Sequence, residues 1–257
     1  MQFNEILFEI KDNIAVLTLN RPDIRNAITG SEIISEIETA CKLVNEDLNI
    51  KVLIITAKDP AFSSGGNIKD MLSKKGMFEG SSMQVMENYR KNIQRIPIAL
   101  TNIEIPLIAA VNGPAIGAGL DMALMCDMRV ASKKAKFGET FLNIGLIPGD
   151  GGAYFLPKVV GMAKACELTF TGDIIDAEEA IKIGLINYVV EHDRLMEKTY
   201  EIAGKIAVKP AFALRMTKRL LYMDKPLKYV LEQSAAYQAL CHTTKEHEEA
   251  LLKMLKK

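Results

Sequence analysis

Residues 105–127 read IPLIAAVNGPAIGAGLDMALMCD, and this stretch decides the fold. It begins with a short apolar run, 107–111, typical of a strand buried on both faces of a parallel sheet. A turn rich in glycine and alanine follows, and residues 121–126 are then apolar on nearly every side, which indicates a buried helix. The same order occurs earlier, where the apolar run 52–57 leads into FSSGGN at 62–67. Two buried strands that each lead into a glycine-rich loop predict an α/β core.

The sequence on either side continues this alternation. Asp12-Asn13 is a hairpin signal, Ser31 is a candidate N-cap, and the Met-rich residues 71–95 suggest a mobile segment leading into a helix. We therefore predict an α/β core followed by a helical region. The expected strands are 3–9, 14–19, 52–57, 107–111, 128–131 and 186–190, and the expected helices are 31–47, 121–126, most of the chain from 151 onward, and two or three amphipathic helices over 210–257.

Length, composition and charge exclude several classes of protein. The chain has 257 residues, 49% hydrophobic and 25% charged, which suits a globular protein with a large core. Lys and Arg together number 32, and so do Asp and Glu, so no overall basic charge supports nucleic-acid binding. The longest uncharged apolar run, 105–120, is interrupted by prolines and glycines, and residues 1–11 lack the apolar run of a signal peptide. We expect a cytoplasmic protein that binds neither nucleic acid nor membrane.

Cysteines and histidines are too scattered for a metal site, which requires clustered ligands. We expect no metal and reduced cysteines, with Cys126 a small core residue. The residues concerned are Cys41, Cys126, Cys166, Cys241, His192, His242 and His247.

The two glycine-rich loops are candidates for binding an oxygen atom. Glycine lets a ligand approach the backbone closely, and N–H groups at a helix start have no partner inside the helix. If Ser64-Gly65-Gly66 and Gly117-Ala118-Gly119 meet in space, they can direct two donors at one carbonyl oxygen, as in an oxyanion hole. The spacing is equally compatible with two ordinary tight turns.

At this point the sequence resembles a known family, the crotonase or enoyl-CoA hydratase/isomerase superfamily. The resemblance is carried by an ordered set of motifs between about residues 15 and 190, and the helical C-terminal region also fits. The motifs are Asn20-Arg21-Pro22, Asn26-Ala27, Phe62 to Asn67, Ile108 to Asp121 with Cys126-Asp127, Phe137-Gly138, Gly145 to Gly152, and Leu168 to Asp173.

The resemblance implies a spiral of repeated ββα units over residues 1–195 and a helical region over 196–257 that builds trimers or dimers of trimers. It implies an acyl-CoA thioester as substrate, with no cofactor beyond the CoA of that substrate. The two N–H groups that polarise the thioester carbonyl match Gly66 and Ala118. Other substrate-binding positions match Ser64, Asn67, Ile68, Lys69 and Phe141.

The acid/base positions depart from the family pattern. Hydratases of the family use two glutamates, of which the first matches Asp121 and the second matches Phe141, a residue with no proton to exchange. Asp150 and Glu139 are the candidates to replace the second group. Because hydration needs two groups and a double-bond shift needs one, we expect weak hydration of crotonyl-CoA and an increase in Phe141→Glu.

Each candidate also has a structural interpretation. Asp121 can stabilise the first turn of a helix through the helix dipole. Asp150 precedes an expected helix and can act as its N-cap. Glu139 can be a structural residue that is paired or exposed near a strand end. Lys69 and Arg25 either meet CoA phosphates or are solvated. Four methionines either line an adaptable acyl pocket or pack loosely in the core; they are Met71, Met77, Met83 and Met86.

Two other functions compete with an acyl-CoA enzyme. Phe141 suggests a non-catalytic acyl-CoA-binding protein. The glycine turn with Tyr154 and Lys158 resembles the motifs of NAD-dependent short-chain dehydrogenases. Against the latter, the glycine turn comes late in the chain, and Pro157 disfavours the helical turn that would align the tyrosine with the lysine.

Overall fold

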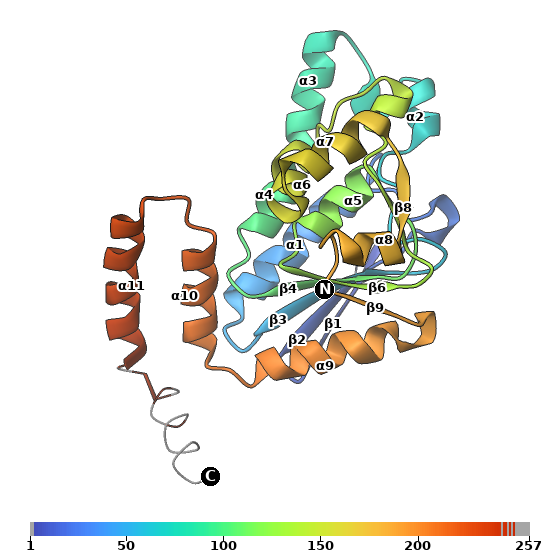
Figure 1. Ribbon diagram of the computed structural model, residues 1–257. Coiled ribbons are helices and arrows are strands. Elements are labelled where there is room, and N and C mark those ends of the chain that lie inside the picture. The colour runs from blue at the N-terminus through green and yellow to red at the C-terminus, as the bar shows by residue number, and fades with distance from the viewer. Residues whose placement is uncertain (1–2, 243, 246, 248, 250–257) are drawn as a thin grey trace.

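A computed structural model describes residues 3–242, 244, 245, 247 and 249, and it contains two sheets (Figure 1). The larger sheet has the order β1-β2-β3-β4-β6-β9, antiparallel between β1 and β2 and parallel elsewhere. The smaller has the order β5-β7-β8. The strands are β1 Ile6–Lys11, β2 Ile14–Leu19, β3 Val52–Ala57, β4 Leu107–Val111, β5 Ala115–Ile116, β6 Met128–Ser132, β7 Lys136–Gly138, β8 Ile174–Asp176 and β9 Tyr188–Val190.

Helices cover both faces of the larger sheet. In Figure 1, α9 runs along one face, whereas α1, α4 and α5 lie on the other. The α-helices are α1 Ile33–Glu46, α2 Ile68–Leu72, α3 Ser82–Lys91, α4 Arg95–Thr101, α5 Ala118–Leu124, α6 Gly152–Val160, α7 Met162–Thr171, α8 Ala177–Lys182, α9 Leu195–Ala207, α10 Ala211–Leu221 and α11 Leu227–His242; the short 3-10 helices are η1 Pro22–Ile24, η2 Gly76–Phe78, η3 Phe141–Ile144 and η4 His192–Arg194.

The β3 strand shows why the central strands are apolar throughout. Leu53 and Ile55 belong to the main core, whereas Val52 and Ile54 belong to a second cluster on the opposite face. Leu195, Ile202 and Ala203 of α9 complete that second cluster. Both faces of the strand are therefore removed from water, as the continuous apolar run predicts.

The N-terminal hairpin is confirmed, with small shifts at its ends. Asp12 and Asn13 both have positive φ, 51° and 66°, which is the backbone that a two-residue hairpin turn requires. The first strand begins at Ile6 rather than residue 3. Helix α1 begins after Glu32, whose side chain makes no capping hydrogen bond. The Ser31 hydroxyl instead accepts a hydrogen bond from the Ile33 N–H at 3.4 Å, so Ser31 caps the start of the helix as predicted.

Two other local predictions need correction. Residues 71–95 form the end of α2, then η2 and α3, and Ser81 and Gln84 close a capping box at the start of α3. The prediction for the chain after residue 151 did not include β8, which pairs with β7. It also began the last strand too early, because β9 starts at Tyr188 rather than at residue 186. These short edge strands carry too few residues for a periodic signal.

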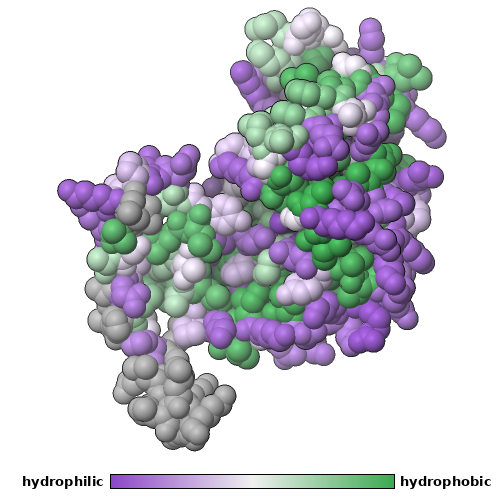
Figure 2. Space-filling view, in the orientation of Figure 1, coloured by the Kyte–Doolittle hydropathy of each residue, from purple (hydrophilic) through white to green (hydrophobic). Residues whose placement is uncertain are grey.

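The C-terminal helices divide into a packed part and a projecting part. The predicted boundary at residue 195 falls before α9, a helix that packs on the larger sheet. Beyond it, α10 and α11 form a hairpin that projects from the rest of the molecule, with apolar side chains such as Leu221 and Leu231 at its surface (Figures 1 and 2). The remainder of the predicted helical region, 250–257, lies outside the described residues.

No helix among the described residues is long and apolar enough to cross a membrane.

Asp127 joins the projecting hairpin to the core. Its Oδ2 accepts hydrogen bonds from the Leu107 N–H at 2.6 Å and the Lys218 ammonium at 2.9 Å, and its Oδ1 accepts from the Tyr222 hydroxyl at 2.6 Å. Lys218 also donates to the Ile105 carbonyl. The side chains of Asp127 and Lys218 are only 18% and 11% exposed, so their ion pair is shielded from water.

We predict that Asp127→Ala destabilises the protein by about 2–4 kcal/mol, because it leaves the Lys218 charge buried without its partner. The matched control is Glu46→Ala, which breaks the exposed Lys42–Glu46 pair and should cost less than about 1 kcal/mol. Urea unfolding followed by circular dichroism measures both. Equal effects of the two substitutions would contradict the anchoring role of Asp127.

Candidate active site

The two glycine-rich loops meet in space. Ser63 forms a β-bridge with Ala115, and the Ile116 N–H donates to the Ser63 carbonyl at 3.0 Å. A Cβ atom at Gly119 would lie 2.3 Å from the same carbonyl oxygen, so no larger residue fits there. The loops after β3 and β4 are therefore neighbours, which is the condition that the oxyanion interpretation of the two glycine-rich loops requires.

Two backbone N–H groups at this contact have no acceptor within the described protein. Ala118 is the first residue of α5, so its N–H has no acceptor inside the helix. A Cβ atom on Gly65 would lie 3.0 Å from the Ala118 nitrogen, which places Gly66 and Ala118 on adjoining turns. Among the described residues neither the Gly66 nor the Ala118 N–H donates a hydrogen bond to the protein. This arrangement can present two donors to one oxygen atom.

Three carboxyl groups lie buried beside these turns. Asp121 is 0% exposed, Glu139 1% and Asp150 7%. Asp121 comes from the first turn of α5, Glu139 follows β7, and Asp150 precedes α6. Residues from three separate segments therefore bring their carboxyl groups together.

Gly152 is the point where two of the carboxyl groups meet. Its N–H donates to Asp121 Oδ2 at 2.9 Å. A Cβ atom at position 152 would lie 2.1 Å from Glu139 Oε1 and 2.5 Å from Asp121 Oδ1. Both carboxyl groups thus pack against the Gly152 Cα, and a larger residue at 152 would have to displace them.

The surroundings of the three groups favour their protonated forms. Burial, followed by the nearby charges of Glu139 and Asp150, raises the pKa of Asp121 well above its usual value. Burial raises the pKa of Glu139 to about 7, with a smaller contribution from Asp150, and burial raises that of Asp150 to about 6. Groups whose pKa lies near neutrality are suited to give and take protons.

Within the described part of the chain, none of the three carboxyl groups forms an ion pair. Asp121 and Glu139 hydrogen-bond to each other when one of them is protonated. Without that proton, four buried carboxyl oxygens have no hydrogen-bond partner among the described residues: Asp121 Oδ1, both Glu139 oxygens and Asp150 Oδ1. Asp150 is not a helix cap, because the N-cap of α6 is Gly151 and no side chain caps it. Glu139 is buried, and the group that it meets is the Asp121 carboxyl. The exposed alternative for Glu139 and the capping interpretation of Asp150 are therefore wrong, the paired alternative for Glu139 stands, and Asp121 accepts a hydrogen bond at the start of α6.

Phe141 lies on the other side of the second turn. A Cβ atom at Gly117 would lie 3.5 Å from its Cζ atom, so the ring covers the turn that carries Ala118. The side chain is half-buried and packs against the main core. Its position beside the Gly117–Ala118 turn is compatible with the predicted substrate-lining role, which stays a prediction.

An apolar pocket of about 730 Å³ adjoins the first turn. Of the four methionines, Met71 and Met86 line it, Met77 is buried in the core and Met83 is 71% exposed. The Met71 Cε atom lies 2.3 Å from the place of a Cβ at Gly66, so the Met71 methyl group packs directly against Gly66. The pocket is lined by Ile68, Met71, Leu72, Lys74, Phe78, Gly80, Ser82, Val85, Met86, Tyr89, Ile144 and Leu146.

The other predicted binding residues surround the first loop. Asn67 is the N-cap of α2 and accepts from the Lys69 N–H at 3.0 Å, which gives its side chain a structural role. The Ser64 hydroxyl donates to the Ile24 carbonyl at 3.3 Å. Ile68 is exposed at the pocket, and Lys69 and Arg25 are exposed to solvent.

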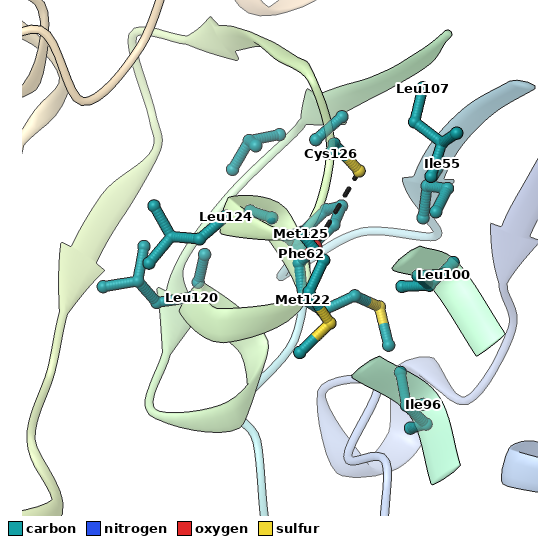
Figure 3. Packing of buried hydrophobic residues seen from close by; sticks show 14 of the residues in the cluster. Ile55, Phe62, Ile96, Leu100, Leu107, Leu120, Met122, Leu124, Met125 and Cys126 are labelled. Carbon is teal, nitrogen blue, oxygen red and sulfur yellow. Dashed lines mark hydrogen bonds between the residues drawn. The ribbon is translucent and has the colours of Figure 1, made fainter. Parts of the chain in front are cut away.

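The core beneath the site is apolar and includes Cys126 (Figure 3). Its thiol lies 3.8 Å from the Met122 carbonyl oxygen, and burial raises its pKa to about 12. A thiol with that pKa is not a nucleophile near neutral pH. The prediction that Cys126 is a core residue is confirmed.

The argument from Pro157 against a dehydrogenase was wrong. Pro157 lies inside α6, and the Lys158 ammonium sits 3.9 Å from the centroid of the Tyr154 ring. The missing proline N–H therefore does not prevent Tyr154 and Lys158 from sharing a helix face. They line a different pocket, which contains Arg129 and Tyr222, away from the glycine-rich loops.

The raised pKa values predict an unusual dependence of stability on pH. For Glu139 and Asp150 the folded state binds protons more tightly than the unfolded chain, so their contribution to stability is full below about pH 4 and is lost as pH rises through about 6–7. Glu139→Gln stays neutral throughout. We predict that it loses less free energy of unfolding between pH 5 and 8 than the parent, measured by urea unfolding.

The control for this comparison is Glu87→Gln, an exposed glutamate on α3, which should follow the parent curve. The same slope in Glu139→Gln as in the parent would show that Glu139 is already ionised at pH 5.

Comparison with known proteins identifies the family. A family profile described as enoyl-CoA hydratase/isomerase matches residues 9–255. The chain is 35% identical to a crotonyl-CoA hydratase of Syntrophomonas wolfei over 100% of this chain and 97% of the relative, and 32% identical to a short-chain-enoyl-CoA hydratase of Clostridium acetobutylicum with the same coverage.

Solved structures agree with these relatives. An enoyl-CoA hydratase from Bacillus anthracis superposes with a TM-score of 0.91 at 29% identity, covering 98% of this chain and 96% of the other. One from Mycobacterium smegmatis gives 0.90 at 26% identity, covering 99% and 97%. These matches overturn the dehydrogenase and the non-catalytic binding protein as alternatives. The chain belongs to the enoyl-CoA hydratase/isomerase family, and is an enzyme of that type with the crotonase fold.

Proposed function

We propose that this enzyme adds water to enoyl-CoA thioesters through a thioester enolate, using Asp121 and Glu139 as its acid and base. The observation that carries the proposal is the pair of buried carboxyl groups at Gly152, without a cation, next to two unused N–H donors. The relatives named crotonyl-CoA hydratase and short-chain-enoyl-CoA hydratase support the same substrate class.

The N–H groups of Gly66 and Ala118 act on the thioester oxygen. When water adds to the β-carbon, the electrons of the double bond move toward the carbonyl and leave negative charge on its oxygen. Two fixed donors stabilise this charge without reorganising, which is typically the largest catalytic contribution in such sites. Met71, whose methyl group covers Gly66, has to move aside for the thioester to enter.

Two carboxyl groups are sufficient for the proton transfers. One carboxylate takes a proton from the attacking water, whose oxygen bonds to the β-carbon. The other, protonated, gives its proton to the α-carbon as the enolate collapses. We assign the second role to Asp121 and the first to Glu139. Asp150 contributes the negative charge that helps to keep one proton on the pair. The reaction uses no cofactor beyond the CoA of the substrate.

This proposal modifies the expectation of weak hydration. That expectation rests on Phe141 alone, which leaves Asp121 as a single carboxylate. Glu139 and Asp150 lie close to Asp121, so more than one carboxyl group is available for the two proton transfers. The relative rates of hydration and double-bond shift stay a prediction.

The remaining parts of the proposal concern binding and assembly. The apolar pocket takes the acyl group, and Lys69 and Arg25 provide positive charge for CoA phosphates. We also propose that the α10–α11 hairpin contacts a second copy in a trimer or a dimer of trimers, because it projects with Leu221 and Leu231 exposed.

We predict that Asp121→Asn and Glu139→Gln separate the two proton transfers. Each substitution removes one acid/base group, which typically contributes about 10²–10⁴-fold. Both should lower kcat for hydration of crotonyl-CoA at least by the lower figure. Exchange of the α-protons of butyryl-CoA with D₂O needs only the group at the α-carbon, so it should fall in Asp121→Asn and persist in Glu139→Gln.

Hydration is measured by loss of enoyl absorbance and exchange by NMR. The control is Glu87→Gln, which should keep both rates. Full hydration by both substituted enzymes would refute the assignment, and loss of exchange only in Glu139→Gln would reverse the two roles.

We further predict that Phe141→Glu rescues Glu139→Gln. By resemblance, position 141 matches the second glutamate of related hydratases, and the Phe141 ring lies beside the turn that bears Ala118. A carboxylate there should restore part of the hydration, at least about 10-fold above Glu139→Gln alone. The control is Phe141→Gln in the same background, which fills similar space without a base. Equal activity of the Glu and Gln double variants would show that a carboxylate at position 141 cannot replace Glu139 as the base.

A further inference from the structure

The loop that carries Asp150 has one polar attachment to the rest of the chain. Residues 147–150 connect η3 to α6, and Ile147 is 74% exposed. Within the described structure, the one hydrogen bond to a backbone group of 147–150 runs from the Gln94 side-chain amide to the Gly149 carbonyl, at 3.0 Å. The position of the Asp150 carboxyl group therefore depends on Gln94, which lies 55 positions before Gly149 in the chain.

An aromatic contact reinforces this hydrogen bond. The Tyr89 Cε1 atom lies 3.5 Å from the place of a Cβ at Gly149, so the ring packs directly on the loop. The Phe78 ring holds Tyr89 from the other side in an edge-to-face contact at 6.4 Å. Gln94 and Tyr89 are themselves linked, because the Gln94 N–H donates to the Tyr89 carbonyl at 3.1 Å.

The same segment forms a wall of the acyl pocket. Val85, Met86 and Tyr89 of α3 line the pocket, and Gln94 is the N-cap of α4, which follows. The side chain of Tyr89 thus contacts the acyl pocket on one side and the Asp150 loop on the other. An acyl group in the pocket presses on the residue that packs against this loop.

We propose that Gln94 is a positioning residue, which together with Tyr89 holds the Gly149 carbonyl and so keeps Asp150 against the Asp121–Glu139 pair. The inference rests on the proposed function, in which the charge of Asp150 keeps a proton on that pair. Gln94 itself does not touch the reacting atoms. Its effect on catalysis passes through Asp150 and must disappear when Asp150 carries no charge.

The test compares Gln94→Leu, Asp150→Asn and the double variant with the parent enzyme. Crotonyl-CoA hydration gives kcat and KM across pH 5–9, and butyryl-CoA α-proton exchange gives a second rate. Gln94→Lys retains a donor long enough to reach the Gly149 carbonyl and serves as the rescue. Asn88→Ala, which removes a hydrogen bond to the Glu79 carbonyl on the far side of α3, is the matched control.

We expect Gln94→Leu to lower kcat about 10-fold or more, since displacement of a catalytic group by about 1 Å can cost about 100-fold. KM should stay within about threefold, because acyl and CoA contacts are kept. The acidic limb of the pH–kcat profile should move to lower pH, because a displaced Asp150 no longer disfavours ionisation of the pair. In the Asp150→Asn background, Gln94→Leu should add nothing.

Gln94→Lys should restore both kcat and the pH profile, and Asn88→Ala should match the parent. Equal factors for Gln94→Leu in both backgrounds would overturn the positioning role, since a merely structural effect does not depend on Asp150. Unchanged rates in Asp150→Asn and Asp121→Asn would instead refute the proposed function, so the two failures are distinguishable.

Discussion

The site depends on the contact between Gly152 and the carboxyl groups of Asp121 and Glu139. The Gly152 N–H binds one Asp121 oxygen, and the absence of a side chain at Gly152 leaves room for the other Asp121 oxygen and for Glu139. Helix α6 begins at this residue, so its unpaired N–H groups and dipole face the carboxyl groups. Among the described residues, this partial positive charge is the main stabilisation of negative charge on Asp121 and Glu139. It is weaker than the stabilisation that a buried cation would give.

The consequence is a site that keeps protons at neutral pH. Two carboxylates cannot both ionise at short range in a dry environment, so at least one proton is shared between Asp121 and Glu139. In the proposed mechanism, hydration needs a base and an acid at the same time, and a pair that holds one proton would supply both. The burial that lowers stability above neutral pH would then also prepare the pair for proton transfer, and the apolar core around α5 maintains this burial.

The fold was largely predictable because its central elements carry strong local signals. The β3 and β4 runs are apolar on both faces, and Asp12-Asn13 specifies its hairpin through backbone conformation alone. The contact of the two glycine-rich loops followed from two strands that share one sheet. By contrast, β8 has only three residues, and its identity as a strand depends on pairing with β7.

The cluster of three buried carboxyl groups could be predicted from the sequence only in part. Asp121, Glu139 and Asp150 were all recognisable as candidates, but nothing in their spacing says that Glu139 turns inward after β7 to meet Asp121. Gln94 and Tyr89 carried no signal, because their relation to Asp150 spans more than fifty residues and two changes of direction. Such contacts arise only when α3, α4 and the loop before α6 pack together.

Phe141 occupies the position of the second glutamate of related hydratases, and the proposed mechanism does not need a carboxyl group there. The ring shields the turn that bears Ala118, which lowers the local dielectric and strengthens both the N–H donors and the mutual effect of the carboxyl groups. A glutamate at 141 would add a charge to a cluster that already holds three carboxyl groups and lacks a cation. In the proposed mechanism, an apolar residue at 141 and a carboxylate at 139 are therefore complementary: the first excludes water, and the second supplies the proton acceptor from the adjoining segment. A chain that departs from the family pattern at one acid/base position then still holds one exchangeable proton in its Asp121–Glu139 pair, beside the N–H groups of Gly66 and Ala118.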